Sequence, residues 1–130
     1  VFIKISPDEE TKTYTNLIEI INNSAIDGVI ISNTSNNQNL KKSLNVAHLP
    51  GGISGKSLKN SSNKILKEIK TMINKEKIIV AVGGVFDVDS YNEKIELGAD
   101  LVQMYTGLIY EGPNLVKRIV KNDKQISSNS

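Results

Sequence analysis

Short apolar runs alternate with segments of helical spacing about four times along this chain of 130 residues. The runs are residues 1–5, 28–32, 77–82 and 100–105, each of a length typical of a strand. Strands that are apolar throughout are covered on both faces, as in a parallel sheet flanked by helices. The pattern therefore predicts an α/β fold built from about four βα units with parallel strands.

Apolar stripes at spacings of three and four residues mark helices after these strands. The helical positions are Tyr14, Leu17, Ile18 and Ile21, then Ile65, Leu66, Ile69, Met72 and Ile73 in a helix over about 60–74, then Tyr91 with Ile95, and finally Leu115, Val116, Ile119 and Val120. Asp8 and Glu9 precede the first helix, and Asp87 and Asp89 precede the third. We expect these carboxylates to favour the helix starts.

One connection, between Ser32 and Leu58, is much longer than the few residues usual in a βα loop. It is rich in Asn, Ser, Lys and Gly, and it ends in a Gly-rich stretch at 51–55, where backbone can approach a ligand closely. We expect it to be functional, because it leaves from the strand end that faces the active site in barrels of βα units.

Length and composition limit the architecture further. A complete (β/α)₈ barrel needs roughly 250 residues, so this chain provides about half of one. Cysteine is absent, which excludes disulfides and Cys-ligated metals. The formal charge of +2 is spread over helices that also carry Glu and Asp, so a solvated face is favoured over a nucleic-acid surface.

We expect the folded unit to cover residues 1–121 and a polar tail to cover 122–130. Val1 opens directly into a strand with no charged leader, so we expect the chain to be the later part of a longer protein. No apolar run approaches the roughly 20 residues that cross a bilayer.

Lys4 lies between Ile3 and Ile5 in the first predicted strand, so it points to the opposite face. At the edge of a sheet it would reach solvent, whereas in a barrel it would point into the mouth. A buried ammonium there needs an anion, which a cofactor or substrate could supply. The residues alone leave both readings open.

Polar and glycine residues at the other strand ends have a similar ambiguity. Residues 32–35 offer hydroxyls and an amide, but Ser, Asn and Thr are also common in turns. Gly84 and Gly107 end successive strands, and backbone N–H groups at two such ends suit one shared anion. No nucleophile–base pair, paired catalytic carboxylates or metal-ligand spacing is evident.

Taken in order, these motifs closely resemble the C-terminal half of class 2 dihydroorotate dehydrogenase, over nearly the whole chain from Val1 to about Val120. The matching segments are 1–8, 27–35, 51–55, 82–85, 98–107 and 110–113. The resemblance implies a (β/α)₈ TIM barrel that holds FMN at its mouth. Departures are modest: the family often has Ala at Ser6, Thr at Ser32 and Ser35, and Pro at Ser57.

The resemblance also implies which residues contact the flavin, the orotate ring and the cofactor phosphate. Lys4 matches the lysine beside the flavin pyrimidine ring, Ser32 a flavin-contacting hydroxyl, and Gly55 a glycine along the flavin. Asn33 and Thr34 match the pair that holds the orotate ring. The cofactor-phosphate contacts are matched by Gly84, Tyr105 and Thr106.

The reaction implied by the resemblance is oxidation of dihydroorotate to orotate in pyrimidine synthesis, with FMN reoxidised by a quinone. The family's base is a serine in the first half of the barrel, so we expect it upstream of Val1 and expect no catalytic residue or metal ligand in this chain. The chain alone should be inactive without that half as a partner. The resemblance also implies peripheral attachment to a bacterial or mitochondrial inner membrane.

Two alternatives stay open. The first is another FMN-dependent barrel oxidoreductase, such as a class 1 dihydroorotate dehydrogenase or a dihydropyrimidine dehydrogenase-like domain, which would use a different electron acceptor. The second is a half barrel that pairs with itself and binds a phosphorylated ligand through Gly84 and Thr106 without catalysis.

Overall fold

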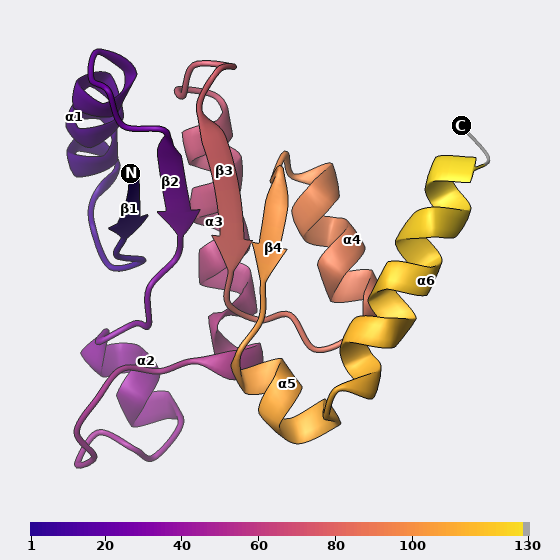
Figure 1. Ribbon diagram of the computed structural model, residues 1–130. Coiled ribbons are helices and arrows are strands. Elements are labelled where there is room, and N and C mark those ends of the chain that lie inside the picture. The colour runs from indigo at the N-terminus through magenta and orange to yellow at the C-terminus, as the bar shows by residue number, and fades with distance from the viewer. Residues whose placement is uncertain (129–130) are drawn as a thin grey trace.

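A computed structural model describes residues 1–128 of the chain, with side chains through Asp123 (Figure 1). Its parallel sheet has the order β1-β2-β3-β4. The strands are β1 (Phe2–Ile5), β2 (Gly28–Ile31), β3 (Ile78–Val82) and β4 (Leu101–Gln103). All four arrowheads in Figure 1 point toward α2 and α5. The predicted parallel βα architecture is confirmed, although β4 is shorter than the expected 100–105.

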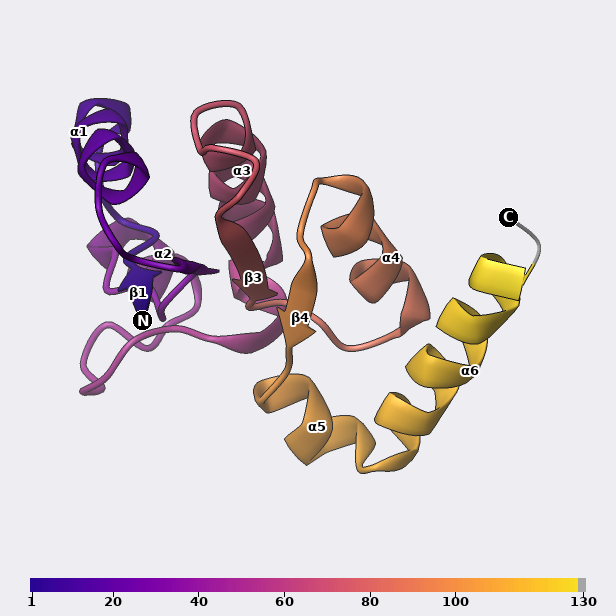
Figure 2. The same cartoon turned by 45° about the horizontal axis from the view of Figure 1, so that its top comes forward.

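The main helices lie along an arc outside the sheet (Figure 2). They are α1 (Thr11–Asn22), α3 (Lys59–Lys70), α4 (Val88–Glu96) and α6 (Asn114–Ser128), with the short α5 (Thr106–Glu111) between β4 and α6. Helix α3 ends before the predicted Asn74. Helix α6 continues into the segment expected to be a polar tail, of which residues 129–130 lie outside the described residues.

The core lies between the helices and one face of the sheet. Alternate strand residues point into it because side chains in a strand change face at each position. Its buried members are Ile5, Tyr14, Ile18, Ile21, Val29, Ile31, Ile65, Leu66, Ile69, Ile79, Ala81 and Ala99. A smaller cluster of Val85, Leu115 and Ile119 joins α6 to the loop after β3.

The opposite face of the sheet is apolar and partly open to solvent. Phe2, Ile78 and Leu101 are 40%, 39% and 57% exposed. Strands β1 and β4 are the two edges of the described sheet. In a closed barrel this face would line the interior and both edges would be paired. The described residues therefore form a partial barrel.

The long connection after β2 holds secondary structure that the sequence did not predict: α2 (Gln38–Ser43) and the 3₁₀ turn η1 (Gly55–Leu58). Asn37 caps α2, its Oδ1 accepting from the amide of Leu40 at 3.0 Å. Ser35 and Ile53 close the base of the loop, because each backbone N–H donates to the other residue's carbonyl. The two ends of the loop are therefore hydrogen-bonded to each other, and the loop is an ordered, closed structure rather than an extended coil.

The expectation that Asp8 charges the start of α1 is wrong. The first turn of α1 holds no acidic residue, and the N-cap residue Glu10 makes no side-chain capping bond. Instead, the Asp8 carboxylate accepts from Ser35 Oγ at 2.5 Å and from the Asn36 amide at 2.6 Å. Asp8 therefore fastens the beginning of the long loop to the end of β1.

Changing Asp8→Asn should lower the free energy of unfolding by about 1–2 kcal/mol, because a carboxamide oxygen is a weaker acceptor and its NH₂ group cannot accept from the second donor. Urea unfolding of the purified chain measures this. Glu10→Gln is the matched control and should change stability little. Equal effects of the two substitutions would show that Asp8 does not hold the loop.

Candidate functional site

A cavity of about 150 Å³ lies at the carboxyl ends of the four strands. It gathers every site residue predicted from the sequence: Lys4, Ser32, Asn33, Thr34, Gly55, Gly84, Tyr105 and Thr106. These residues come from all parts of the chain and meet because the carboxyl ends of parallel strands share one edge of the sheet. The remaining lining residues are Ser54, Leu58, Val82, Gly83, Val85, Met104 and Gly107.

The end of β2 is fixed by the two neighbouring strands. The Ser32 amide donates to the Val82 carbonyl at 3.0 Å, and the Asn33 amide donates to the Ile5 carbonyl at 2.8 Å. Ser32 is buried, whereas Asn33 and Thr34 are exposed at the mouth. Asn33 Oδ1 accepts from the Thr34 amide at 2.9 Å, which leaves its NH₂ group as a donor for a ligand.

Lys4 is exposed on the edge strand β1 and also lines the cavity. Its neighbour Ile5 points into the core, so the lysine stands on the opposite face, as the strand period requires. Lys4 therefore lies on an edge strand and beside the cavity, it is exposed rather than buried, and its role stays a prediction. None of the residues lining the cavity is acidic. The cavity consequently favours an anion.

The glycine turn after β3 is packed directly on helix α3. Gly84 has φ +76°, and an added Cβ would lie 2.5 Å from Lys59 Cα. This position therefore needs glycine for its backbone conformation and for the close approach. The Gly84 loop is held at the cavity by α3 on its outer side.

A second close approach involves Thr34, one of the two residues predicted to hold the substrate. A Cβ on Gly52 would lie 2.2 Å from Thr34 Oγ1, so the Gly-rich stretch of the long loop packs against Thr34. Ser54, in the same stretch, shares a hydrogen bond with Thr106 at 3.0 Å between the two hydroxyl oxygens. Sequence reasoning did not select Ser54, although its place in the 51–55 motif was an available signal.

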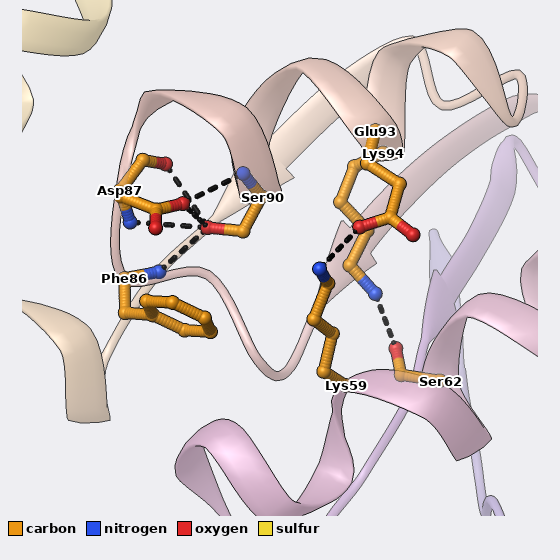
Figure 3. Close-up of polar contacts among 7 residues, drawn as sticks. All are labelled: Lys59, Ser62, Phe86, Asp87, Ser90, Glu93 and Lys94. Carbon is orange, nitrogen blue, oxygen red and sulfur yellow. Dashed lines mark hydrogen bonds and ion pairs between the residues drawn. The ribbon is translucent and has the colours of Figure 1, made fainter.

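Phe86 and Asp87 lead from the turn after β3 into the start of α4 (Figure 3). Asp87 caps this helix as predicted, its Oδ1 accepting from the Ser90 amide at 2.7 Å. Burial acts to raise the pKa of the Asp87 carboxyl, but hydrogen bonds from Ser90 outweigh it and hold the pKa below its usual value. The Ser90 hydroxyl also accepts from the Phe86 amide at 3.0 Å. This capping box fixes where the turn joins α4.

The donor set of the cavity fits the phosphate-bearing end of FMN. It combines hydroxyls, a glycine turn and an ammonium with no carboxylate, which is the chemistry of an anion site. The volume is below the roughly 300–1,000 Å³ of pockets that enclose a whole ligand. A second space of about 610 Å³ adjoins it through Gly55 and Thr106, and its lining includes both Lys56 and Glu111. The described residues therefore fit part of such a ligand.

Across the described residues, no group of three His, Cys, Asp or Glu side chains is placed to hold a metal ion. In the same part of the chain, no helix has both the length and the apolar character needed to span a membrane.

A family model described as dihydroorotate dehydrogenase matches residues 1–126. The "dihydroorotate dehydrogenase (quinone)" of Bartonella tribocorum is 39% identical over 126 residues, covering 97% of this chain and 35% of the relative. The protein of the same name from Dichelobacter nodosus is 41% identical over 117 residues, covering 90% and 34%. The chain thus spans about a third of the length of the curated relatives it matches.

Solved structures agree with the sequence matches. The crystal structure of DHODH in complex with ferulenol from Eimeria tenella aligns with a TM-score of 0.82 and 32% identity, over 91% of this chain and 31% of that chain. The ligand-free structure from the same organism aligns with the same TM-score and identity. The partial barrel is therefore similar to one part of a larger enzyme.

Proposed function

The chain belongs to the dihydroorotate dehydrogenase family, and from that premise we propose that it supplies the FMN-phosphate and orotate-binding loops of a quinone-dependent enzyme of pyrimidine synthesis. One observation carries the proposal: all the residues that the family resemblance selects line a single cavity without a carboxylate. The enzyme would oxidise dihydroorotate to orotate.

The proposed roles come from the family resemblance, and the placement of the side chains is compatible with them. Asn33 and Thr34, exposed at the mouth, hold the orotate ring through the free NH₂ donor and the hydroxyl. Gly84, Tyr105 and Thr106, which line the same cavity, would contact the FMN phosphate. Bound FMN supplies the two-electron acceptor for the oxidation.

In the same proposal Ser32, Gly55 and Lys4, which line the cavity, would contact the flavin ring, with the ammonium of Lys4 toward its pyrimidine part. A positive charge held there before reaction favours the negative charge that develops during the oxidation.

The general base of this proposal lies outside these 130 residues. The cavity contains two serines, but the Ser32 hydroxyl donates to the Asn33 carbonyl at 3.1 Å and the Ser54 hydroxyl pairs with Thr106. Neither hydroxyl has an imidazole or carboxylate among the lining residues to take its proton. The base and the quinone contact therefore come from the rest of the barrel.

The partner of this chain is that remaining part of the barrel. It would pair with edges β1 and β4 and cover the apolar face that carries Phe2, Ile78 and Leu101. Peripheral association with a bacterial or mitochondrial inner membrane belongs to the same proposal, and its attaching element would also lie in the remaining part. Family resemblance is its only support.

A hybrid tests the proposal: this chain replaces the segment it matches in the Bartonella tribocorum relative. We expect the hybrid to reduce a quinone analogue when given dihydroorotate, and the 130-residue chain alone to give no turnover. Turnover by the chain alone would contradict the assignment of the base to the rest of the barrel. A folded hybrid without turnover would contradict the proposed activity.

A further inference from the structure

Lys94 on α4 is fully buried, with 0% of its surface exposed. Its ammonium makes one hydrogen bond in the described structure, to Ser62 Oγ at 2.8 Å (Figure 3). Burying an unpaired charge is costly, so such lysines are normally paired or neutral. The roles proposed above make no use of this side chain.

Glu93, the preceding residue on α4, is not paired with Lys94. Its Oε2 lies 2.6 Å from Lys59 Nζ, on the side of α4 that faces the start of α3. Lys94 takes part in no ion pair of the described residues. The buried charge therefore has no direct counter-ion within that part of the chain.

A short chain of hydrogen bonds joins Lys94 to the cavity. Ser62 accepts from Lys94 and donates to the Val82 carbonyl at 2.8 Å. The same carbonyl accepts from the amide of Ser32, which lines the cavity. An added Cβ on Gly83 would lie 3.5 Å from Ser62 Oγ, so Ser62, to which the ammonium is bonded, packs against the glycine turn.

We propose that Lys94 is a positioning residue that strengthens binding of the FMN phosphate, because its buried charge lies behind the turn of residues 82–85 and acts through Ser62. The bound phosphate is then the counter-ion that the protein interior does not provide. This inference rests on the proposed function for the identity of the anion. The proposal extends the phosphate site to a residue outside the cavity, Lys94, which no sequence motif indicated.

Desolvation lowers the pKa of Lys94 to about 8, with Glu93 acting to raise it and Lys59 to lower it. The side chain is thus charged at neutral pH but close to its titration range. A dianion bound on the cavity side of the turn would favour the charged form of Lys94 and raise this pKa. A lysine with a purely structural role would not respond to phosphate.

The first test uses the full 130-residue chain with inorganic phosphate as the probe. The Cε chemical shift of Lys94 is followed by NMR against pH, with saturating phosphate and with chloride at equal ionic strength. Phosphate should raise the pKa of Lys94 by about one unit, which corresponds to a tenfold preference for the anion when the lysine is charged. An unchanged pKa would overturn the proposal.

The second test compares FMN with riboflavin, which lacks the phosphate, in the hybrid barrel. Lys94→Met should reduce the preference for FMN over riboflavin by about tenfold, measured as dissociation constants from flavin fluorescence. Ser62→Ala removes the hydroxyl that links Lys94 to the Val82 carbonyl but keeps the lysine. It should also reduce the preference for FMN over riboflavin. Lys67→Met, at an exposed position of α3, is the control and should leave the preference unchanged.

The outcomes separate the two proposals. A hybrid that keeps its full preference for FMN in both Lys94→Met and Ser62→Ala would overturn the role of Lys94 and leave the proposed function standing. A hybrid that binds no flavin, together with a phosphate-dependent pKa of Lys94 in the chain, would contradict the proposed function and support a phosphate site that Lys94 strengthens.

Discussion

Replacing Gly84 with alanine is expected to destabilise the fold by about 3 kcal/mol and to remove FMN from the hybrid barrel. Two costs add at this position. The φ of +76° is unfavourable for a residue with a Cβ, and that Cβ would lie 2.5 Å from the Cα of Lys59. Because the neighbour is helix backbone, it cannot move aside without shifting the start of α3.

Gly51→Ala is the matched control, because Gly51 has φ +87° but no atom within 4 Å of an added Cβ. Gly51→Ala should lower the free energy of unfolding only by the cost of placing alanine at a positive φ, about 1 kcal/mol. Urea unfolding and flavin absorbance of the two variants measure the difference. If Gly84→Ala unfolds like Gly51→Ala and keeps its flavin, the turn is not fixed against α3 in the way described.

Lys4→Met in the hybrid should lower kcat for dihydroorotate oxidation by roughly 10²–10³, because removing one preorganised group that stabilises developing charge costs about that much. FMN content should change little, since the phosphate loops are intact. Rapid mixing with dihydroorotate, followed at the flavin absorbance, measures the reductive step directly.

Lys12→Met is the comparison for Lys4, since Lys12 is exposed on α1 and does not line the cavity. It should leave the rate unchanged. A Lys4→Met hybrid that is reduced as fast as the parent would show that the ammonium at the mouth serves solubility or substrate attraction instead of the chemical step.

Stability should also depend on pH through Lys94. Its pKa is lower in the folded chain, about 8, than the usual value near 10.4 in an unfolded chain, so the unfolded state binds more protons between these values. Stability should therefore rise with pH from about 8 to 10.4, by about 3 kcal/mol. Below pH 8 Lys94 is charged in both the folded and the unfolded state, so burying the charge lowers the free energy of unfolding by an amount that no longer depends on pH. Thermal unfolding of Lys94→Met should lack this rise.

The strand ends could be predicted from the sequence because they depend on local pattern plus one topological rule. Short apolar runs fixed β1 to β4, and parallel βα units bring the carboxyl ends of strands to one edge. Lys4, Asn33 and Thr106 are far apart in the chain, yet their meeting at one cavity follows from that rule alone.

Contacts between distant segments could not be predicted in this way. Asp8 reads as a helix-start charge, but its partner Ser35 is 27 residues away, and only the folded loop brings them together. Helix α2 lies in a polar stretch whose stability depends on its cap at Asn37. Lys94 is one of several charged residues on α4, and its partner in the interior, Ser62, lies 32 residues earlier.

The most direct test of the central claim, that this chain supplies the flavin and orotate loops of a dihydroorotate dehydrogenase, is the visible absorption spectrum of the hybrid before and after anaerobic addition of dihydroorotate. We expect a bound-flavin spectrum that bleaches on addition. A folded hybrid that is colourless, or whose flavin is not reduced by dihydroorotate, would contradict the claim.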